Sequence, residues 1–249
     1  STDFVVGTAL GIDRYHPDYL PLYLATHTLG GNFSARLMQT VRVKEGLTYG
    51  INSSLSGFGN GNDGYWMVGG TFSPKLLSKG ESSTLREIKL WAEEGITQKE
   101  LDVTKSTLVG GFQVGFDTTG GLAGGILNAA VIYNDLTYLD SYPNMVKDVT
   151  LEQANSAITK YINFDGLYQV AAGTIDKDGN VGIGTTQPNQ QLSVSAGTDG
   201  ENSLSKKNSG QAKDCFEKVN RGIFAFNQSL DGSRSLLVII SIASPLLSL

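Results

Sequence analysis

Arg42 and Tyr49 are the residues of this chain best suited to chemistry. They lie seven positions apart, separated by a Gly-Leu step at which a helix should end and a strand should begin. This arrangement would direct a permanently charged guanidinium and a phenol towards the same space. Both groups donate hydrogen bonds to a peptide carbonyl. Donors aimed at a developing oxyanion contribute roughly 2.7–4 kcal/mol each where water is excluded.

The same spacing leaves a purely structural role open, and taken alone it favours that role. In this alternative, Arg42 pairs with a nearby carboxylate such as Glu45, and Tyr49 is half-buried in the sheet.

No base, metal site or nucleophile accompanies the pair in the sequence. The only histidines are His16 and His27, eleven positions apart, with no glutamate placed as a general base. A hydrolytic zinc site needs three protein ligands and an open position. We therefore expect His27 to be a packed or surface residue of the first helix and His16 to lie at its start. The lone Cys215 has no partner histidine nearby in sequence and is expected to be inert. We predict no metal or cofactor in this chain.

The composition is that of an ordinary globular protein. The 249 residues are 40% hydrophobic and 17% charged, with a net charge of −5. An acidic chain without a basic stripe does not suit nucleic acid. The apolar run at 236–249 is too short and too interrupted to cross a membrane, which takes about 20 apolar residues. Because the chain begins at Ser1, we expect a processed product or an excised fragment.

The order of elements predicts an α+β fold, a mixed or antiparallel sheet packed against helices. A strand, helices, two strands, a run of helices and a final strand follow one another, which does not suit an alternating parallel fold. Two capping boxes, which begin at Thr97 and Thr150, fix the starts of two helices. The expected strands span 3–12, 47–58, 65–72 and 167–174, and the expected helices span 17–29, 34–41, 82–94, 97–108, 120–133, 138–147 and 150–161.

Three glycine pairs lie within the run of expected helices, at 110–111, 120–121 and 124–125. Such pairs more often permit close approach between helices than bind a ligand.

The amino-acid composition changes near Asp176, where we place the main domain boundary. Residues 1–175 form the folded domain. Residues 176–210 are rich in Gly, Ser and Asn and form a linker or fibre-like segment without a core of its own. Residues 211–249 hold a short aromatic fragment and the apolar tail, and we do not expect them to form an independent domain.

Several motifs of residues 1–175 together resemble one family. The segment 29–38, Leu-Gly-Gly-Asn-Phe-Ser-Ala-Arg-Leu-Met, is followed by Arg42 and by Gly-Leu-Thr-Tyr-Gly at 46–50. This order is similar to the C-terminal, zinc-free domain of the pitrilysin/insulinase-type zinc peptidases, which include the mitochondrial processing peptidases and their bacterial relatives. Val43 departs from the pattern, because relatives often carry an acidic residue after the arginine.

The resemblance implies a function. In that family two similar α+β halves close around a peptide. One half carries a zinc motif, and the other supplies an arginine and a tyrosine to the substrate or the tetrahedral intermediate. By resemblance these are Arg42 and Tyr49. We expect a non-catalytic half that is inactive alone. Its partner would be a zinc-bearing half, on the same parent chain or a second subunit, and its substrate a peptide.

Two other readings stay open. The fold could be a relic that serves as a scaffold or assembly module without catalysis. Residues 178–188 resemble a short motif of phage tail-fibre and adhesin-like proteins, which would suit a fibre component. Residues 216–227 resemble the opening of the VacJ-like lipoproteins, a match too short to imply lipid transport. Among compartments, the bacterial periplasm or cell envelope is favoured.

Overall fold

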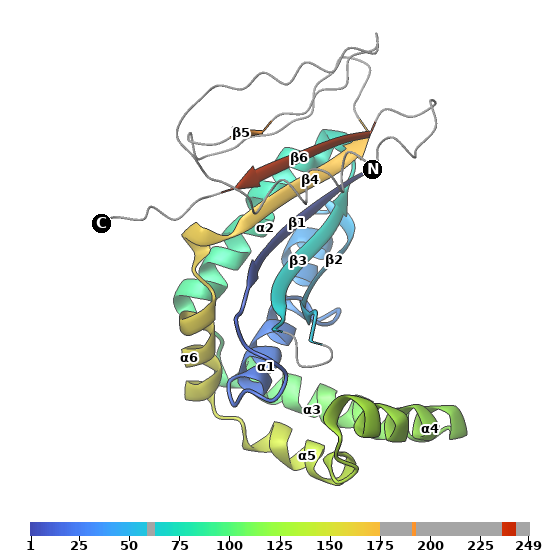
Figure 1. Cartoon of the computed structure of the whole chain (residues 1–249). Coiled ribbons are helices and arrows are strands. Elements are labelled where there is room, and N and C mark those ends of the chain that lie inside the picture. The colour runs from blue at the N-terminus through green and yellow to red at the C-terminus, as the bar shows by residue number, and fades with distance from the viewer. Residues whose placement is uncertain (59–62, 175–190, 193–235, 243–249) are drawn as a thin grey trace.

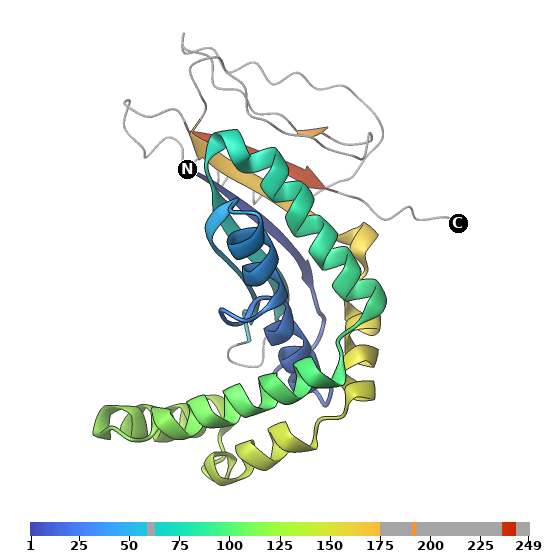
Figure 2. The same ribbon diagram turned by 180° about the vertical axis from the view of Figure 1, so that it is seen from behind.

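The computed structural model describes residues 1–58, 63–174, 191–192 and 236–242. Helices cover one face of an antiparallel sheet, and the other face of the sheet carries no described helix (Figures 1 and 2). The predicted α+β fold is confirmed. The tail segments 178–188 and 216–227 and the boundary near Asp176 lie outside the described residues, as does Cys215.

Residues 1–174 contribute four strands to the sheet: β1 (Thr2–Ala9), β2 (Thr48–Ser56), β3 (Tyr65–Phe72) and β4 (Tyr168–Thr174). Their order is β2-β3-β1-β4, and every neighbouring pair is antiparallel. β1 therefore lies between β3 and β4, so the first and the last of these four strands are neighbours. All four lie where the sequence predicts strands.

A strand that the sequence analysis did not predict continues the sheet. β6 (Leu236–Ile242) pairs with β4 in antiparallel register, and the two-residue β5 (Gln191–Leu192) pairs with β6. The reason lies in long-range pairing: the open edge of β4 offers unpaired backbone groups, and a run rich in Leu, Ile and Val suits a strand. The sequence analysis treats this run only as an apolar tail.

The helices follow the predicted order, with shifted ends. The short helix expected over 34–41 is a π-helix, η1, that runs on to Lys44, and α2 begins five residues earlier than predicted, after the turn at Pro74. The helical elements are α1 (Tyr19–Gly30), η1 (Met38–Lys44), η2 (Pro74–Leu76), α2 (Leu77–Glu94), α3 (Gln98–Gly115), α4 (Thr119–Asn128), η3 (Ala129–Tyr133), α5 (Tyr138–Asp148), α6 (Leu151–Tyr161) and η4 (Phe164–Gly166). In the part of the chain that the structure describes, no helix is long and apolar enough to cross a membrane.

Both predicted capping boxes are present. At the start of α3 the Glu100 amide donates to the Thr97 hydroxyl, and the Thr97 amide donates to the Glu100 carboxylate at 2.7 Å. Thr150 and Gln153 do the same at the start of α6. These boxes satisfy amides that a helix leaves unpaired at its first turn.

The core lies between the sheet and α1, α2 and α6. Trp66 of β3 and Trp91 of α2 are fully buried and stack with ring centroids 5.8 Å apart. The Trp91 indole donates to the Ala25 carbonyl at 3.1 Å, which joins α2 to α1. This layer fixes η1 and β2, the two elements that carry Arg42 and Tyr49.

Candidate functional site

The junction between η1 and β2 positions both predicted site residues. The amide of Gly46 donates to the Arg42 carbonyl at 3.1 Å, and the amide of Leu47 donates to the Val41 carbonyl at 3.0 Å. Gly46 has a φ of 63°, a left-handed conformation that favours glycine. The chain therefore turns from helix to strand within a few residues, as the sequence predicts. Arg42 and Tyr49 lie on either side of this turn, which backbone hydrogen bonds hold in place.

Tyr49 is exposed because it sits in a β-bulge at the start of β2. Thr48 pairs with Phe72 and Gly50 with Thr71, so Tyr49 is the additional residue on the edge strand. The Thr48 hydroxyl donates to the carbonyls of Gly50 and Thr71, at 3.0 and 2.5 Å, and holds the bulge in place. The Tyr49 side chain is 96% exposed. The half-buried tyrosine of the structural alternative is wrong.

Arg42 is half-buried and lies over an aromatic ring. Its guanidinium carbon is 4.7 Å from the centroid of Phe33, itself an exposed residue. Among the described residues Arg42 forms no ion pair and no side-chain hydrogen bond. Glu45 binds Arg86 and Ser83 instead, at 2.6 and 2.5 Å. The predicted alternative pairing of Arg42 with Glu45 is therefore wrong. Phe33, which the sequence analysis quotes only as part of the motif, is the residue that supports the guanidinium.

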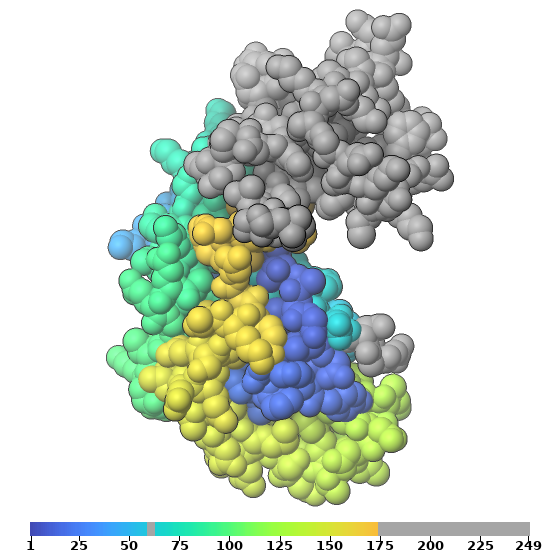
Figure 3. Space-filling model, turned by 60° about the vertical axis from the view of Figure 1, so that its left-hand side comes forward, coloured from blue at the N-terminus to red at the C-terminus, as the bar shows by residue number. Residues whose placement is uncertain are grey.

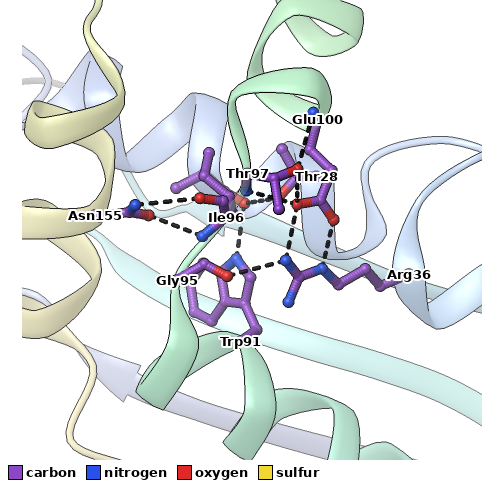
Figure 4. Close-up of polar contacts among 9 residues, drawn as sticks. Thr28, Arg36, Trp91, Gly95, Ile96, Thr97, Glu100 and Asn155 are labelled. Carbon is purple, nitrogen blue, oxygen red and sulfur yellow. Dashed lines mark hydrogen bonds and ion pairs between the residues drawn. The ribbon is translucent and has the colours of Figure 1, made fainter.

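A second arginine of the same motif has a structural role. The Arg36 Nε and Nη2 atoms donate to the two carboxylate oxygens of Glu100, at 2.6 and 2.8 Å, and Nη2 also donates to the Gly95 carbonyl at 2.9 Å (Figure 4). Burial raises the pKa of Glu100, but the hydrogen bonds from Arg36 and Thr97 outweigh it and bring the pKa to about 2. Arg36 thus ties the segment before η1 to the start of α3.

The two histidines lie where the sequence predicts. His27 is half-buried on α1 beside Tyr23, and burial lowers its pKa. His16 precedes α1, and its Nδ1 accepts the amide of Asp18 at 3.1 Å. Within residues 1–58, 63–174 and the two tail strands, no group of three or more His, Cys, Asp or Glu residues is placed to hold a metal ion.

Comparison with known proteins gives the same family as the motifs. Residues 5–108 match the family model described as the peptidase M16 inactive domain, M16 being the pitrilysin/insulinase-type family. Over 154 residues the chain is 28% identical to the "Non-peptidase homolog YmxG" of Helicobacter pylori, covering 60% of this chain and 34% of that protein. It is 27% identical to the "Uncharacterized zinc protease YmxG" of Bacillus subtilis, covering 69% of this chain and 40% of that protein. The chain thus spans well under half of these relatives.

The fold has a solved counterpart as well. The crystal structure of a peptidase M16 inactive domain from Pseudomonas fluorescens superposes with a TM-score of 0.59 and 31% identity, covering 68% of this chain and 40% of that one. The residues that the family model matches lie within the described part of the chain. Residues 5–108 of this chain are thus similar to the peptidase M16 inactive domain in sequence, and the chain shares the fold of a solved example.

Proposed function

We propose that this chain is the non-catalytic half of a zinc metalloendopeptidase, which completes a peptide-binding chamber with a zinc-bearing half. Arg42 and Tyr49 would donate hydrogen bonds to a substrate carbonyl or to its oxyanion. One observation carries the proposal: the exposed Tyr49 phenol and the Arg42 guanidinium, which has no carboxylate partner among the described residues, extend from the same junction between η1 and β2. The zinc of the partner half would supply the attacking water.

Each residue is suited to a different part of this task. The Arg42 guanidinium lies over Phe33 and presents a planar set of donors. Tyr49 adds a single neutral donor on an edge strand. Neither can activate water or act as a nucleophile here, so their contribution is to bind and orient the peptide and to stabilise charge that develops on its carbonyl oxygen.

An exposed apolar arm supports the need for a partner. Residues 118–134 contain no charged residue. Around them, large apolar side chains of α3, α4, η3 and the following turn face solvent, and this arm lies at the lower end of the molecule in Figure 3. The exposed side chains are Val114, Leu122, Ile126, Leu127, Val131 and Leu136. Soluble proteins rarely expose such a surface unless another molecule covers it.

The test is co-expression of this chain with a zinc-bearing M16 half and assay of an unstructured fluorogenic peptide. We expect the Arg42→Ala variant to lower kcat/KM about tenfold or more, because a lost oxyanion donor acts on the transition state. Tyr49→Phe, which removes only the hydroxyl, should lower it as well. Size-exclusion chromatography should show an unchanged complex in both cases.

Lys44→Ala is the matched control, because Lys44 is an exposed cation on the same turn and has no proposed role. An intact complex with full activity in both the Arg42 and Tyr49 variants would rule out the proposed role of the pair.

A scaffold without catalysis is the second candidate, and the name "Non-peptidase homolog" of the Helicobacter pylori relative favours it. In that case no zinc-bearing half would gain activity from this chain. Substitutions in the apolar arm, such as Leu127→Asp, would then disrupt assembly, while Arg42→Ala would change nothing measurable.

A further inference from the structure

A cavity of ≈ 620 Å³ lies between α1, the end of β2 and the helices α3, α4, η3 and α5. Its volume is within the range of about 300–1,000 Å³ that small-molecule sites occupy. It is separate from the candidate site described above. Leu55, near the end of β2, lines it, whereas Tyr49 is at the start of the same strand, about 20 Å away at the rise of a β-strand.

Seven of the described residues that line the cavity are aromatic. Tyr133 and Tyr138 stack with centroids 3.6 Å apart, and Phe112 lies 4.6 Å from both Phe116 and Tyr142. The hydroxyls of Tyr19, Tyr23 and Tyr142 form no hydrogen bond among the described residues. Burial raises the pKa of all three, that of Tyr19 to about 12, so they stay protonated donors at neutral pH. The aromatic lining residues are Tyr19, Tyr23, Phe112, Phe116, Tyr133, Tyr138 and Tyr142.

Glycines also line the cavity, and they differ in the space around them. A Cβ on Gly121 or Gly125 would collide with Gly115 or Phe116, so these two permit close helix packing, as the sequence analysis expects of paired glycines. A Cβ on Gly111 or Gly124 would meet nothing within 4 Å, although both line the cavity. A side chain added at Gly111 would therefore enter open space.

Among the described residues that line the cavity, Arg14 is the only charged one. Its guanidinium lies between two tyrosine rings, 5.4 Å from the centroid of Tyr19 and 5.6 Å from that of Tyr133. Nη1 donates to the Tyr133 hydroxyl at 3.0 Å, whereas Nε is buried without a hydrogen-bond partner. No carboxylate of the described residues pairs with it.

Arg36 has the carboxylate partner that Arg14 lacks among the described residues. In the same protein the Nε and Nη2 atoms of Arg36 hold both oxygens of Glu100. Planar two-point binding of a carboxylate is the arrangement that an arginine side chain favours. Aromatic rings such as those around Arg14 also surround cationic ligands in other proteins. Here the rings already contact the positive charge of Arg14, which would repel a second cation. The cavity therefore suits an anion.

We propose that this cavity binds a carboxylate attached to a compact apolar or aromatic group. The carboxylate pairs with Arg14 and accepts hydrogen bonds from the tyrosine hydroxyls, while the apolar group lies against the aromatic rings and the glycine backbone. Two sources share this chemistry: a free aryl or alkyl carboxylic acid, and the C-terminal residue of a peptide. The inference does not depend on the role proposed for Arg42 and Tyr49.

The experiment is isothermal titration of the full chain with 3-phenylpropionate and with its neutral amide, and then with a short peptide that ends in phenylalanine, as free acid and as C-terminal amide. We expect the acid to bind at least tenfold more tightly than its amide. Tighter binding of the peptide acid assigns the site to a chain end, and tighter binding of phenylpropionate assigns it to a free acid.

Two variants test the location. Arg14→Met should weaken binding of the acid at least tenfold and abolish the difference between acid and amide, with Arg86→Met, an arginine outside the cavity, as its control. Gly111→Leu should block binding by filling the cavity, whereas Gly110→Leu, on the same helix but outside the cavity wall, should not. Equal binding of acid and amide, no binding of either acid, or full binding by the Gly111→Leu variant would overturn the proposal.

Discussion

Glu81 shows how strongly the surroundings of a single residue set its chemistry. It lies on α2, only 7% exposed, and burial raises its pKa to about 7. Glu100, of the same residue type, has a pKa of about 2 because hydrogen bonds from Arg36 and Thr97 outweigh its burial. One carboxyl therefore resists ionisation and the other resists protonation. The two make opposite contributions to the pH dependence of stability.

Because its folded-state pKa exceeds the ordinary value of 4.5, Glu81 binds a proton in the folded chain over a range where the unfolded chain has lost it. Its contribution to stability should fall as pH rises from about 4.5 to about 7. We expect Glu81→Gln to raise the free energy of unfolding by about 1–3 kcal/mol near pH 8 and by little near pH 4.5. Urea unfolding at both pH values measures this.

Glu93→Gln, at an exposed position of the same helix, should change stability little at either pH and serves as the control. An equal gain for Glu81→Gln at both pH values would show that its effect is not due to ionisation.

At the scale of elements, the approach of α1 to β2 depends on the absence of a side chain. A Cβ on Gly30, the last residue of α1, would lie 2.5 Å from the backbone nitrogen of Ser53. Ser53 also donates its hydroxyl to the Thr26 carbonyl at 2.7 Å. Gly30, which the sequence analysis quotes only as part of the motif at 29–38, therefore lets the helix and the strand pack together.

We expect Gly30→Ala to destabilise the fold by about 1–3 kcal/mol, because the added methyl group forces the helix and the strand apart. Thermal unfolding followed by far-ultraviolet circular dichroism measures the effect. Gly50→Ala is the matched control, since a Cβ there meets nothing within 4 Å. A melting temperature unchanged by Gly30→Ala, or lowered equally by both variants, would contradict this account of the contact.

At the scale of the whole molecule, the described chain offers donors and surfaces but no group of metal ligands. Since the proposed function places the zinc in a partner half, we expect the purified chain, supplied with zinc, not to hydrolyse unstructured peptides. Mass spectrometry of a peptide mixture after long incubation measures this. Cleavage that a chelator abolishes, and that persists through further purification, would contradict the prediction.

The sequence predicts well those features that depend on neighbouring residues. Helical and strand periodicity and the Thr97 and Thr150 boxes locate most elements, and the order of motifs gives the family. Features that depend on distant residues are not predictable in this way. Arg14 meets Tyr133 across 119 positions of sequence. Glu45 pairs with a residue 41 positions away rather than with its neighbour Arg42.

Other predictions stay predictions. They are the domain boundary near Asp176, the tail resemblances, the favoured bacterial periplasm or cell envelope, and the roles of Arg42 and Tyr49. For the last two residues, the structure shows an exposed tyrosine and a half-buried arginine, and the co-expression assay tests their action on a peptide.

The stacked pair in the core has a practical consequence for studying this protein in solution. Trp66 and Trp91 are the only tryptophans of the chain, and both are sealed between β3 and α2. Indole emission excited at the red edge therefore reports on one location, the packing of the sheet against its helices. Residues 175–249 add no tryptophan signal of their own. An optical readout can thus follow the packing within residues 1–174 without a label, while the rest of the chain stays attached.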